Sequence, residues 1–242
     1  MVRIDEFTIE TTAIAGLFVV RMKQIHDERG TVREFFRAST MRQAGLHAGP
    51  WQQLNLTETA RGAVRGLHGE DMTKLVSVVQ GSVFGAYVDV RIDSPTVGAV
   101  VTVPIEIGVQ VLVPKGVCNG FQPTGDGVNQ YLYCFDNEWR PGMPGCSVNP
   151  LDPALGIDWP IPVDPDDRAQ LSAKDAAAPT LAETLAALRA PDAILGRPHA
   201  SLGVGFSACP TTNCSPPSRR RWPGWWTPRS SVRSPSWAWW SR

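Results

Sequence analysis

Short valine-rich segments with a period of two run through the middle of the chain and limit what it can fold into. They begin with Lys74 to Arg91 and recur as VVTVPI, VQVLVP and VNQYLYCF, which ends at Phe135. Such alternation places successive side chains on opposite faces of a strand. Gly and Pro punctuate the runs, with Gly81 and Gly85 as predicted turn or bulge points. We therefore predict an all-β core whose short strands form a closed or double-sheet architecture.

The segments on either side of this core predict only short elements. Residues 1–26 read as extended segments, and residues 39–46 predict one or two helical turns capped by Ser39 or Thr40. Thr180 and Glu183 form a capping box that opens a second helix, LAETLAALRA. Between the two expected helices, residues 139–162 are rich in proline, which breaks helices, and they predict an extended strap without helix.

The composition changes near residue 201. The last 42 residues contain six of the nine tryptophans and six arginines, but no acidic residue and no regular apolar period. A chain of 242 residues can hold one large β domain or one domain with a tail. We expect a core domain over residues 1–195 and an irregular or disordered tail over 196–242, which resembles an out-of-frame translation. We expect this tail to be dispensable for folding and turnover, since it offers no face to a core.

Charge and cysteine usage limit the partners and the compartment. The formal net charge is zero, and the first 200 residues are mildly acidic. The five cysteines include no CxxC pair, and no apolar run is long enough for a membrane span. We expect a cytoplasmic protein without a nucleic-acid or membrane partner. Cys118 and Cys134 lie in apolar surroundings and are expected to be small buried side chains.

One histidine and one lysine stand close together before the valine-rich core. His68 follows RGAVRGL, and Lys74 comes six residues later at the start of the first strand-like run. A neutral histidine can abstract a proton beside a carbonyl, and a lysine can hold the oxyanion that forms. The alternative is an ordinary buried histidine and a solvated lysine at a strand end.

Three other places carry groups suited to a ligand. The polar positions of WQQLNLTET alternate with Leu54 and Leu56, and they either face solvent or line a polar pocket. The Arg-Gly turn in DERGTVREFF is either structural or a contact for an anion or nucleotide. Tyr131 and Tyr133 share one strand face, where a tyrosine is either core or a general acid.

A set of strings in fixed order gives the chain a family resemblance. They are DERG with Glu34, QQLNLT, RGAVRGLH, TKLVSVVQGSVFGAYVDVR, DSPTVG, VLVPKGVCNGF, YLYCFDNEWRPG, NPLDPALGIDWP and LSAKD. With them, over roughly residues 20–180, the chain resembles the cupin-fold dTDP-4-dehydrorhamnose 3,5-epimerase family of deoxysugar biosynthesis. The resemblance implies a cupin-type double-stranded jelly roll and an isomerase that needs no cofactor. It would invert carbon 3, carbon 5 or both of a dTDP-4-keto-6-deoxyhexose through an enolate.

The resemblance also implies roles for catalytic residues. His68 would remove the proton beside the ketone, and Asp175 would orient and charge this histidine. Lys74 would stabilise the enolate oxygen. Tyr133 would return a proton from the opposite face of the sugar. Inversion requires such a base and acid on the two faces of a planar enolate.

Substrate-binding residues follow from the same resemblance. Arg65 and Arg29 would hold the diphosphate, and Arg29 would come from the neighbouring subunit of a homodimer whose N-terminal strands are exchanged. The nucleotide and sugar pocket would be lined by Gln53, Asn55 and Glu34.

The chain departs from the family pattern at two pocket positions. Asn119 stands where the family usually has a histidine before Gly-Phe, and Trp139 stands where it usually has a second tyrosine. These changes remove two titratable groups and add bulk, so we expect exchange at carbon 3 to precede exchange at carbon 5. A 3-only epimerase and a non-catalytic sugar-nucleotide-binding cupin are the alternatives. The four histidines, 26, 47, 68 and 199, form no His-x-His cluster, so we expect no metal.

Overall fold

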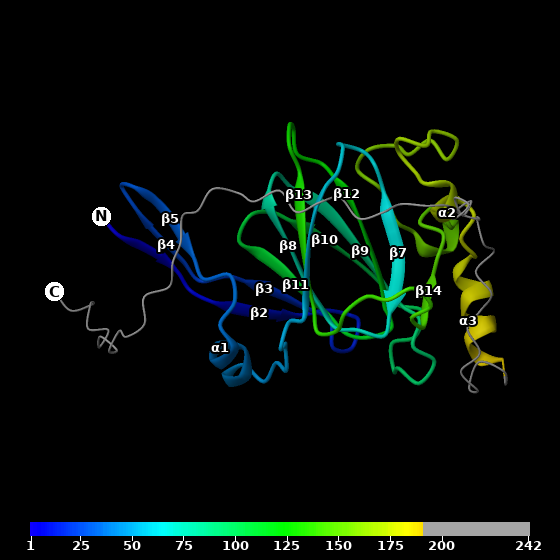
Figure 1. The fold of residues 1–242 in the computed structure, drawn as a ribbon, viewed down its shortest axis with the longest axis horizontal. Coiled ribbons are helices and arrows are strands. Elements are labelled where there is room, and N and C mark those ends of the chain that lie inside the picture. The colour runs from blue at the N-terminus through cyan, green and yellow to red at the C-terminus, as the bar shows by residue number, and fades with distance from the viewer. Residues whose placement is uncertain (191–242) are drawn as a thin grey trace, which may run out of the picture. The chain divides into compact units, whose positions relative to one another are not determined.

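The computed structural model describes residues 1–190, and their strands form three sheets in which every pairing is antiparallel. Figure 1 shows the two large sheets at the centre of this region. The six-stranded sheet has the order β2 (Thr8–Thr11), β3 (Phe18–Arg21), β11 (Val109–Val113), β8 (Lys74–Gln80), β13 (Gln130–Phe135) and β6 (Gln53–Glu58). The five-stranded sheet has the order β10 (Val100–Ile105), β9 (Val83–Asp89), β12 (Val117–Pro123), β7 (Arg65–Glu70) and β14 (Gly145–Ser147). The double-sheet prediction is therefore confirmed.

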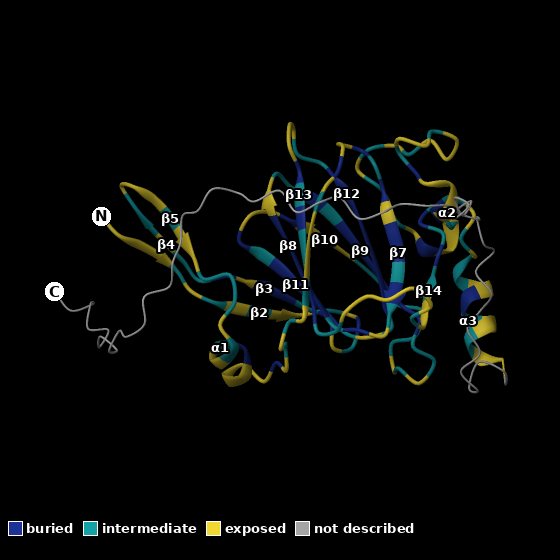
Figure 2. Ribbon diagram, in the orientation of Figure 1, coloured by how far each residue is buried: buried dark blue, intermediate teal, exposed yellow. Residues whose placement is uncertain are grey.

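The main hydrophobic core lies between the two large sheets. Val76 and Val111 contribute to it from the six-stranded sheet, and Tyr87 and Phe121 contribute from the five-stranded sheet. All four are at most 1 % exposed. Burial of valine and aromatic side chains on the inner faces is what their period-two pattern requires, and it is the main favourable term in folding. Figure 2 shows this concentration of buried residues on the central strands.

Two further clusters cover the outer faces of the sheets. Residues of the six-stranded sheet pack against Met41 of α1 (Ala38–Gln43). On the five-stranded sheet, Cys118 and Val148 pack against α3 (Leu181–Arg189) and the strap that precedes it. Cys118 and Cys134 are buried, as their apolar surroundings predict.

A third, small sheet lies apart from the core. It has the order β1 (Arg3–Asp5), β4 (Gln24–Asp27) and β5 (Gly30–Arg33). Figure 1 shows the β4–β5 hairpin extending away from the strands of the five-stranded sheet. Its apolar side chains remain exposed, including Val32 at 70 % and Ile4 at 48 %.

The helical predictions have mixed outcomes. α3 begins with the predicted capping box between Thr180 and Glu183, which is confirmed. The predicted cap of α1 is wrong, because the helix begins earlier, with Arg37 at the N-cap and no side-chain cap. No described helix is long and apolar enough to cross a membrane.

Two other local predictions need correction. The strap contains a short 3₁₀ helix, Pro153–Leu155, because proline is tolerated in the first helical turn and Asp152 caps it. Gly85 is neither a turn nor a bulge but lies within β9. A β-carbon at this position would lie 2.9 Å from the Tyr87 hydroxyl, so a side chain has no room there. The predicted tail, 196–242, and the predicted domain end at 195 lie outside the described residues.

Candidate active site

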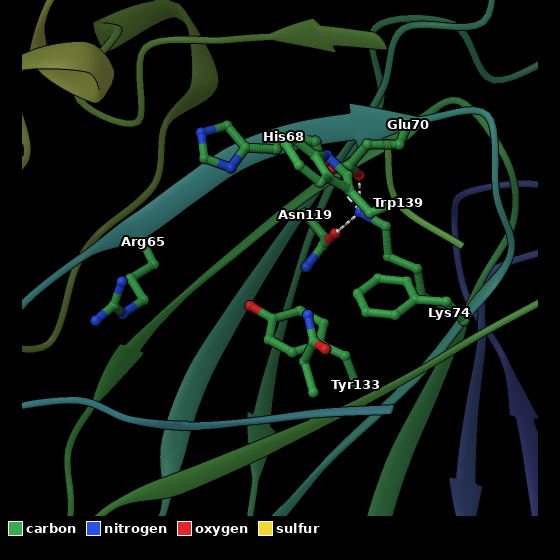
Figure 3. A pocket seen from close by; sticks show the side chains of 9 residues that line it. Arg65, His68, Glu70, Lys74, Asn119, Tyr133 and Trp139 are labelled. Atoms are coloured by element: carbon green, nitrogen blue, oxygen red, sulfur yellow. Dashed lines mark hydrogen bonds and ion pairs between the residues drawn. The ribbon is translucent and has the colours of Figure 1, made fainter. Parts of the chain in front are cut away.

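A pocket of about 250 Å³ opens between the two large sheets. Its walls combine charged, amide and aromatic side chains, and Figure 3 shows most of them pointing toward one space. The lining residues are Asn55, Arg65, His68, Glu70, Lys74, Asn119, Tyr133, Phe135 and Trp139. A small pocket with several convergent polar groups is the usual form of a ligand or active site.

The strand register explains why His68 and Asn119 lie side by side. They are direct partners in the pairing of β7 with β12. The two strands approach closely next to this pair, because a β-carbon on Gly66 would lie 2.6 Å from Gly120 Cα. Gly66 also has a φ of +121°, which favours glycine. Glycine at this position therefore allows the close approach that places both side chains in the pocket wall.

His68 is paired with a buried carboxylate. Its Nε2 lies 2.7 Å from Oδ1 of Asp175, which sits in the short helix α2 (Ala173–Ala176). The Ser172 side chain caps α2 by accepting a hydrogen bond from the Asp175 amide, at 3.0 Å. Burial raises the pKa of Asp175, but hydrogen bonds and the nearby His68 outweigh it, so this pKa is lowered overall. Asp175 therefore stays ionised and fixes the orientation of the imidazole.

Tyr133 reaches the pocket from the opposite sheet. It belongs to β13 and is the direct partner of Asn55 on β6. Its ring stacks on Phe135, with centroids 5.5 Å apart, and meets Tyr131 edge to face at 4.9 Å. Burial and the negative charge of Glu70 raise the pKa of Tyr133, against the opposing effect of Arg65. The phenol therefore remains protonated at neutral pH.

Lys74 lies at the back of the pocket and is 3 % exposed. Its Nζ donates to Asn119 Oδ1 at 2.5 Å and to the His68 carbonyl oxygen at 3.3 Å, and it forms an ion pair with Glu70. These partners compensate the cost of burying an ammonium group. Within residues 1–190, no three His, Cys, Asp or Glu side chains cluster closely enough to hold a metal ion.

The rim of the pocket is held by hydrogen bonds of Gln53. Its Nε2 donates to Asn55 Oδ1 at 3.0 Å, and its Oε1 accepts from the Trp139 backbone N–H at 2.8 Å. Trp139 is 55 % exposed. Arg65 is also exposed, and its Nε donates to the Thr59 hydroxyl at 2.8 Å.

The structure brings together nine of the eleven residues expected in the site. Arg29 and Glu34 lie elsewhere in the same chain: Arg29 pairs with Asp27, and Glu34 pairs with Arg37. Two lining residues were not expected, Glu70 and Phe135. The period of two could have found both, since each lies two residues after an expected site residue on the same strand.

Comparison with known proteins matches the sequence of this chain to one enzyme family. The model of the dTDP-4-dehydrorhamnose 3,5-epimerase family matches residues 11–183. A dTDP-4-dehydro-6-deoxyglucose 3-epimerase of Streptomyces bikiniensis is 38 % identical over 162 residues, which cover 64 % of this chain and 80 % of that protein. A dTDP-4-dehydrorhamnose 3,5-epimerase of Salmonella typhimurium is 35 % identical over 180 residues, which cover 72 % of this chain and 95 % of that protein.

Solved structures agree with the sequence relatives. A 3,5-epimerase of Legionella pneumophila, in complex with dTDP-4-keto-L-rhamnose, matches with a TM-score of 0.65 and 34 % identity, covering 74 % of this chain and 97 % of that one. A 3′-monoepimerase of Streptomyces bikiniensis, in complex with dTDP-quinovose, matches with a TM-score of 0.64 and 35 % identity, covering 72 % and 87 %. These matches confirm the expected cupin-type fold, and the chain belongs to the dTDP-4-dehydrorhamnose 3,5-epimerase family.

Proposed function

We propose that this chain inverts carbon 3, carbon 5 or both of a dTDP-4-keto-6-deoxyhexose, with His68 and Tyr133 as the proton-transfer groups. The observation that carries the proposal is the His68–Asp175 pair on one wall of a pocket whose facing sheet supplies Tyr133. Inversion beside a ketone requires removal of a proton from one face of the sugar and delivery of a proton to the other. Groups on two facing sheets meet that requirement.

His68 acts as the base. A carboxylate can only accept, so Nε2 carries the proton in the hydrogen bond to Asp175, and the neutral ring keeps a lone pair on Nδ1. That nitrogen takes the proton from the carbon beside the ketone. The charge of Asp175 then stabilises the imidazolium that results.

Tyr133 acts as the acid. Its raised pKa keeps the hydroxyl protonated until the enolate has formed. The packing against Phe135 and Tyr131 fixes the direction of the phenol. Lys74 lines the same pocket, and its ammonium contributes to stabilising the negative charge that develops on the ketone oxygen.

The exposed rim binds the nucleotide diphosphate and the sugar. Arg65 is a guanidinium suited to phosphate, and it is already held at the pocket mouth by Thr59. Asn55 and Trp139, joined through Gln53, form the opposite part of the rim. The related structures with dTDP-4-keto-L-rhamnose and dTDP-quinovose support a dTDP-sugar as the ligand.

A second copy of the chain completes the site. Arg29 is 89 % exposed in its side chain and lies outside the pocket of its own chain, on the turn between β4 and β5. The hairpin and strand β6 also expose apolar side chains, Val32 at 70 %, Leu54 at 59 % and Leu56 at 54 %. A homodimer that buries these surfaces brings Arg29 to the diphosphate of the neighbouring pocket. Glu34 follows the same hairpin and belongs to the same shared edge.

The enzyme acts in the cytoplasm, which supplies dTDP-sugars in reduced surroundings. The five cysteines of the chain show no framework of paired spacings, in keeping with such a compartment.

The protons on carbon 3 and carbon 5 of the sugar should exchange with solvent at different rates. Each of these carbons carries an electron-withdrawing oxygen, the hydroxyl on carbon 3 and the ring oxygen on carbon 5, so the pocket and not the acidity sets the order of exchange. Asn119 and Trp139 shape the part of the pocket that must accept a second sugar pose for inversion at carbon 5. Exchange at carbon 3 therefore comes first, with carbon 5 slower or absent.

The proposal is tested by proton NMR in deuterated water with dTDP-4-keto-6-deoxyglucose. Deuterium should enter carbon 3 first, at a rate proportional to the concentration of enzyme. Tight binding of the nucleotide sugar without exchange at either carbon would show a binding protein instead. Rapid exchange at carbon 5 with none at carbon 3 would overturn the assigned order.

A further inference from the structure

The buried ammonium of Lys74 is held by three protein groups. A lysine ammonium offers three N–H donors and no acceptor. Here two hydrogen bonds go to Asn119 Oδ1 and the His68 carbonyl oxygen, and the ammonium forms an ion pair with the carboxylate of Glu70. Since the side chain is 3 % exposed, solvent supplies no alternative partner. A direct contact between the Lys74 ammonium and an enolate oxygen would compete with these three protein contacts.

The contact with Lys74 fixes the orientation of the Asn119 amide. Because an ammonium group only donates, the atom of Asn119 that faces it must be the oxygen Oδ1. The nitrogen Nδ2 therefore lies on the other side of the amide, and Figure 3 shows it facing Tyr133. Among the described residues, none accepts a hydrogen bond from Nδ2, although Asn119 is only 4 % exposed. Two N–H donors are thus held in the pocket without a protein partner.

Asn119 is also in the right place relative to the base. It is the direct partner of His68 across the β7–β12 ladder, and both side chains line the pocket. In the substrate, the carbon that loses its proton is bonded to the ketone carbon. A base and an oxyanion donor for this reaction must therefore be neighbours, as His68 and Asn119 are.

We propose that Nδ2 of Asn119 is the hydrogen-bond donor that stabilises the enolate oxygen, and that Lys74 is a positioning residue which orients and polarises this amide. The inference rests on the proposed epimerase function and assigns a further catalytic residue to it. A cation bound to the amide oxygen draws electron density from the nitrogen and strengthens its N–H donors. A donor fixed before the reaction costs no reorganisation when charge develops.

Glu70 makes this arrangement electrically neutral. Its ion pair with Lys74 offsets the lysine charge inside the pocket. The enolate therefore meets a polarised amide, and the lysine remains bound by protein groups throughout the reaction. Removing Lys74 alone would leave the carboxylate of Glu70 unpaired beside the reacting atoms, so any test of Lys74 must neutralise Glu70 as well.

The first experiment removes the donor and keeps its surroundings. Asn119→Asp preserves the shape and the contact with Lys74 but removes both N–H groups, and Asn119→Ala removes the whole amide. We expect both variants to incorporate deuterium into dTDP-4-keto-6-deoxyglucose about 100-fold more slowly than the wild-type chain, which is the usual effect of losing one oxyanion donor. The dissociation constant for dTDP, which has no ketone, should remain within about twofold. Gln43→Ala, at the exposed end of α1, is the matched control and should leave both values unchanged.

Exchange within about threefold of the wild-type rate in both variants would overturn the inference while leaving the proposed function intact. Absence of exchange in the wild-type chain would contradict the proposed function itself, and this inference with it.

The second experiment separates the roles of Lys74 and Asn119. Four proteins, all carrying Glu70→Gln, are compared: the background, Lys74→Met, Asn119→Ala and the double variant. If Lys74 acts only through the amide, the double variant should be no slower than Asn119→Ala, to within about twofold. If Lys74 contacts the substrate directly, the two losses should multiply, and this result would contradict the positioning role. Binding of dTDP by all four proteins checks that each one folds.

Discussion

Asp175 Oδ1 lies 2.7 Å from His68 Nε2, although 107 residues separate the two in the chain. One belongs to a short helix after the proline-rich strap and the other to a central strand. The carboxylate has a side-chain exposure of 8 % against 33 % for the imidazole. The pair therefore has a buried end that fixes the tautomer and an accessible end that can meet a substrate.

Asp175→Asn should lower turnover strongly without loss of fold. An amide can donate to Nε2, which leaves the proton on Nδ1 and removes the lone pair needed by the base. We expect the turnover number to fall by about 100-fold to 10⁴-fold, as for other carboxylate–histidine pairs. Steady-state kinetics measures it, with exposed Asp158→Asn as the matched control. Wild-type turnover in Asp175→Asn would show that the tautomer does not matter.

Tyr133→Phe should separate proton removal from inversion. The variant keeps the ring that stacks on Phe135 but lacks the acid. His68 can still remove a proton and return a deuteron to the same face, so deuterium should enter the sugar with its configuration retained. NMR coupling constants around carbon 3 distinguish the two epimers. Inversion at the wild-type rate would exclude Tyr133 as the acid.

Arg29→Ala should weaken substrate binding through the neighbouring subunit. Loss of one charge-assisted contact with phosphate should raise KM about tenfold or more. Mixed dimers of Arg29→Ala and His68→Ala contain one pocket with both native residues, provided that Arg29 acts across the interface. They should regain activity with the wild-type KM, whereas Arg33→Ala alone should change little. A monomeric protein, or mixed dimers without such recovery, would refute a shared site.

Asp89 should make stability depend on pH in the acid range. It is fully buried, and although burial raises its pKa, hydrogen bonds from Arg91, Ser94 and Thr96 lower it to about 2. A folded-state pKa below the ordinary value of 3.8 means that this stabilisation is complete above pH 3.8 and is lost as the pH falls through about 2. The shift corresponds to about 2 kcal/mol.

Urea unfolding of the wild-type chain and Asp89→Asn measures this contribution. The difference in unfolding free energy should shrink by about 2 kcal/mol between pH 5 and pH 2. A difference that is constant over this range would show that the charge of Asp89 is not stabilising.

The sequence predicted those parts of the fold that depend on local pattern. The period of two around Lys74 to Arg91 predicted the strands, and the Thr180–Glu183 box predicted the start of α3. The start of α1 was mispredicted because Ser39 and Thr40 have cap propensity but lie inside the helix. Propensity alone does not include the pairing of Arg37 with Glu34 just before the helix.

The site was predicted less completely, for a physical reason. The resemblance supplied His68, Asp175 and Tyr133, but contacts between separate strands decide which donors remain free. The protein contacts that hold the Lys74 ammonium become visible only when Glu70 and Asn119 are placed around it. Likewise, the position of Arg29 relative to the pocket depends on where the hairpin extends.

Solvent deuterium incorporation by His68→Ala tests the central claim most directly. If His68 is the base that forms the enolate, this variant should bind dTDP like the wild-type chain but should incorporate no deuterium into dTDP-4-keto-6-deoxyglucose above the rate without enzyme. Deuterium entering at the wild-type rate, at either carbon 3 or carbon 5, would contradict the claim.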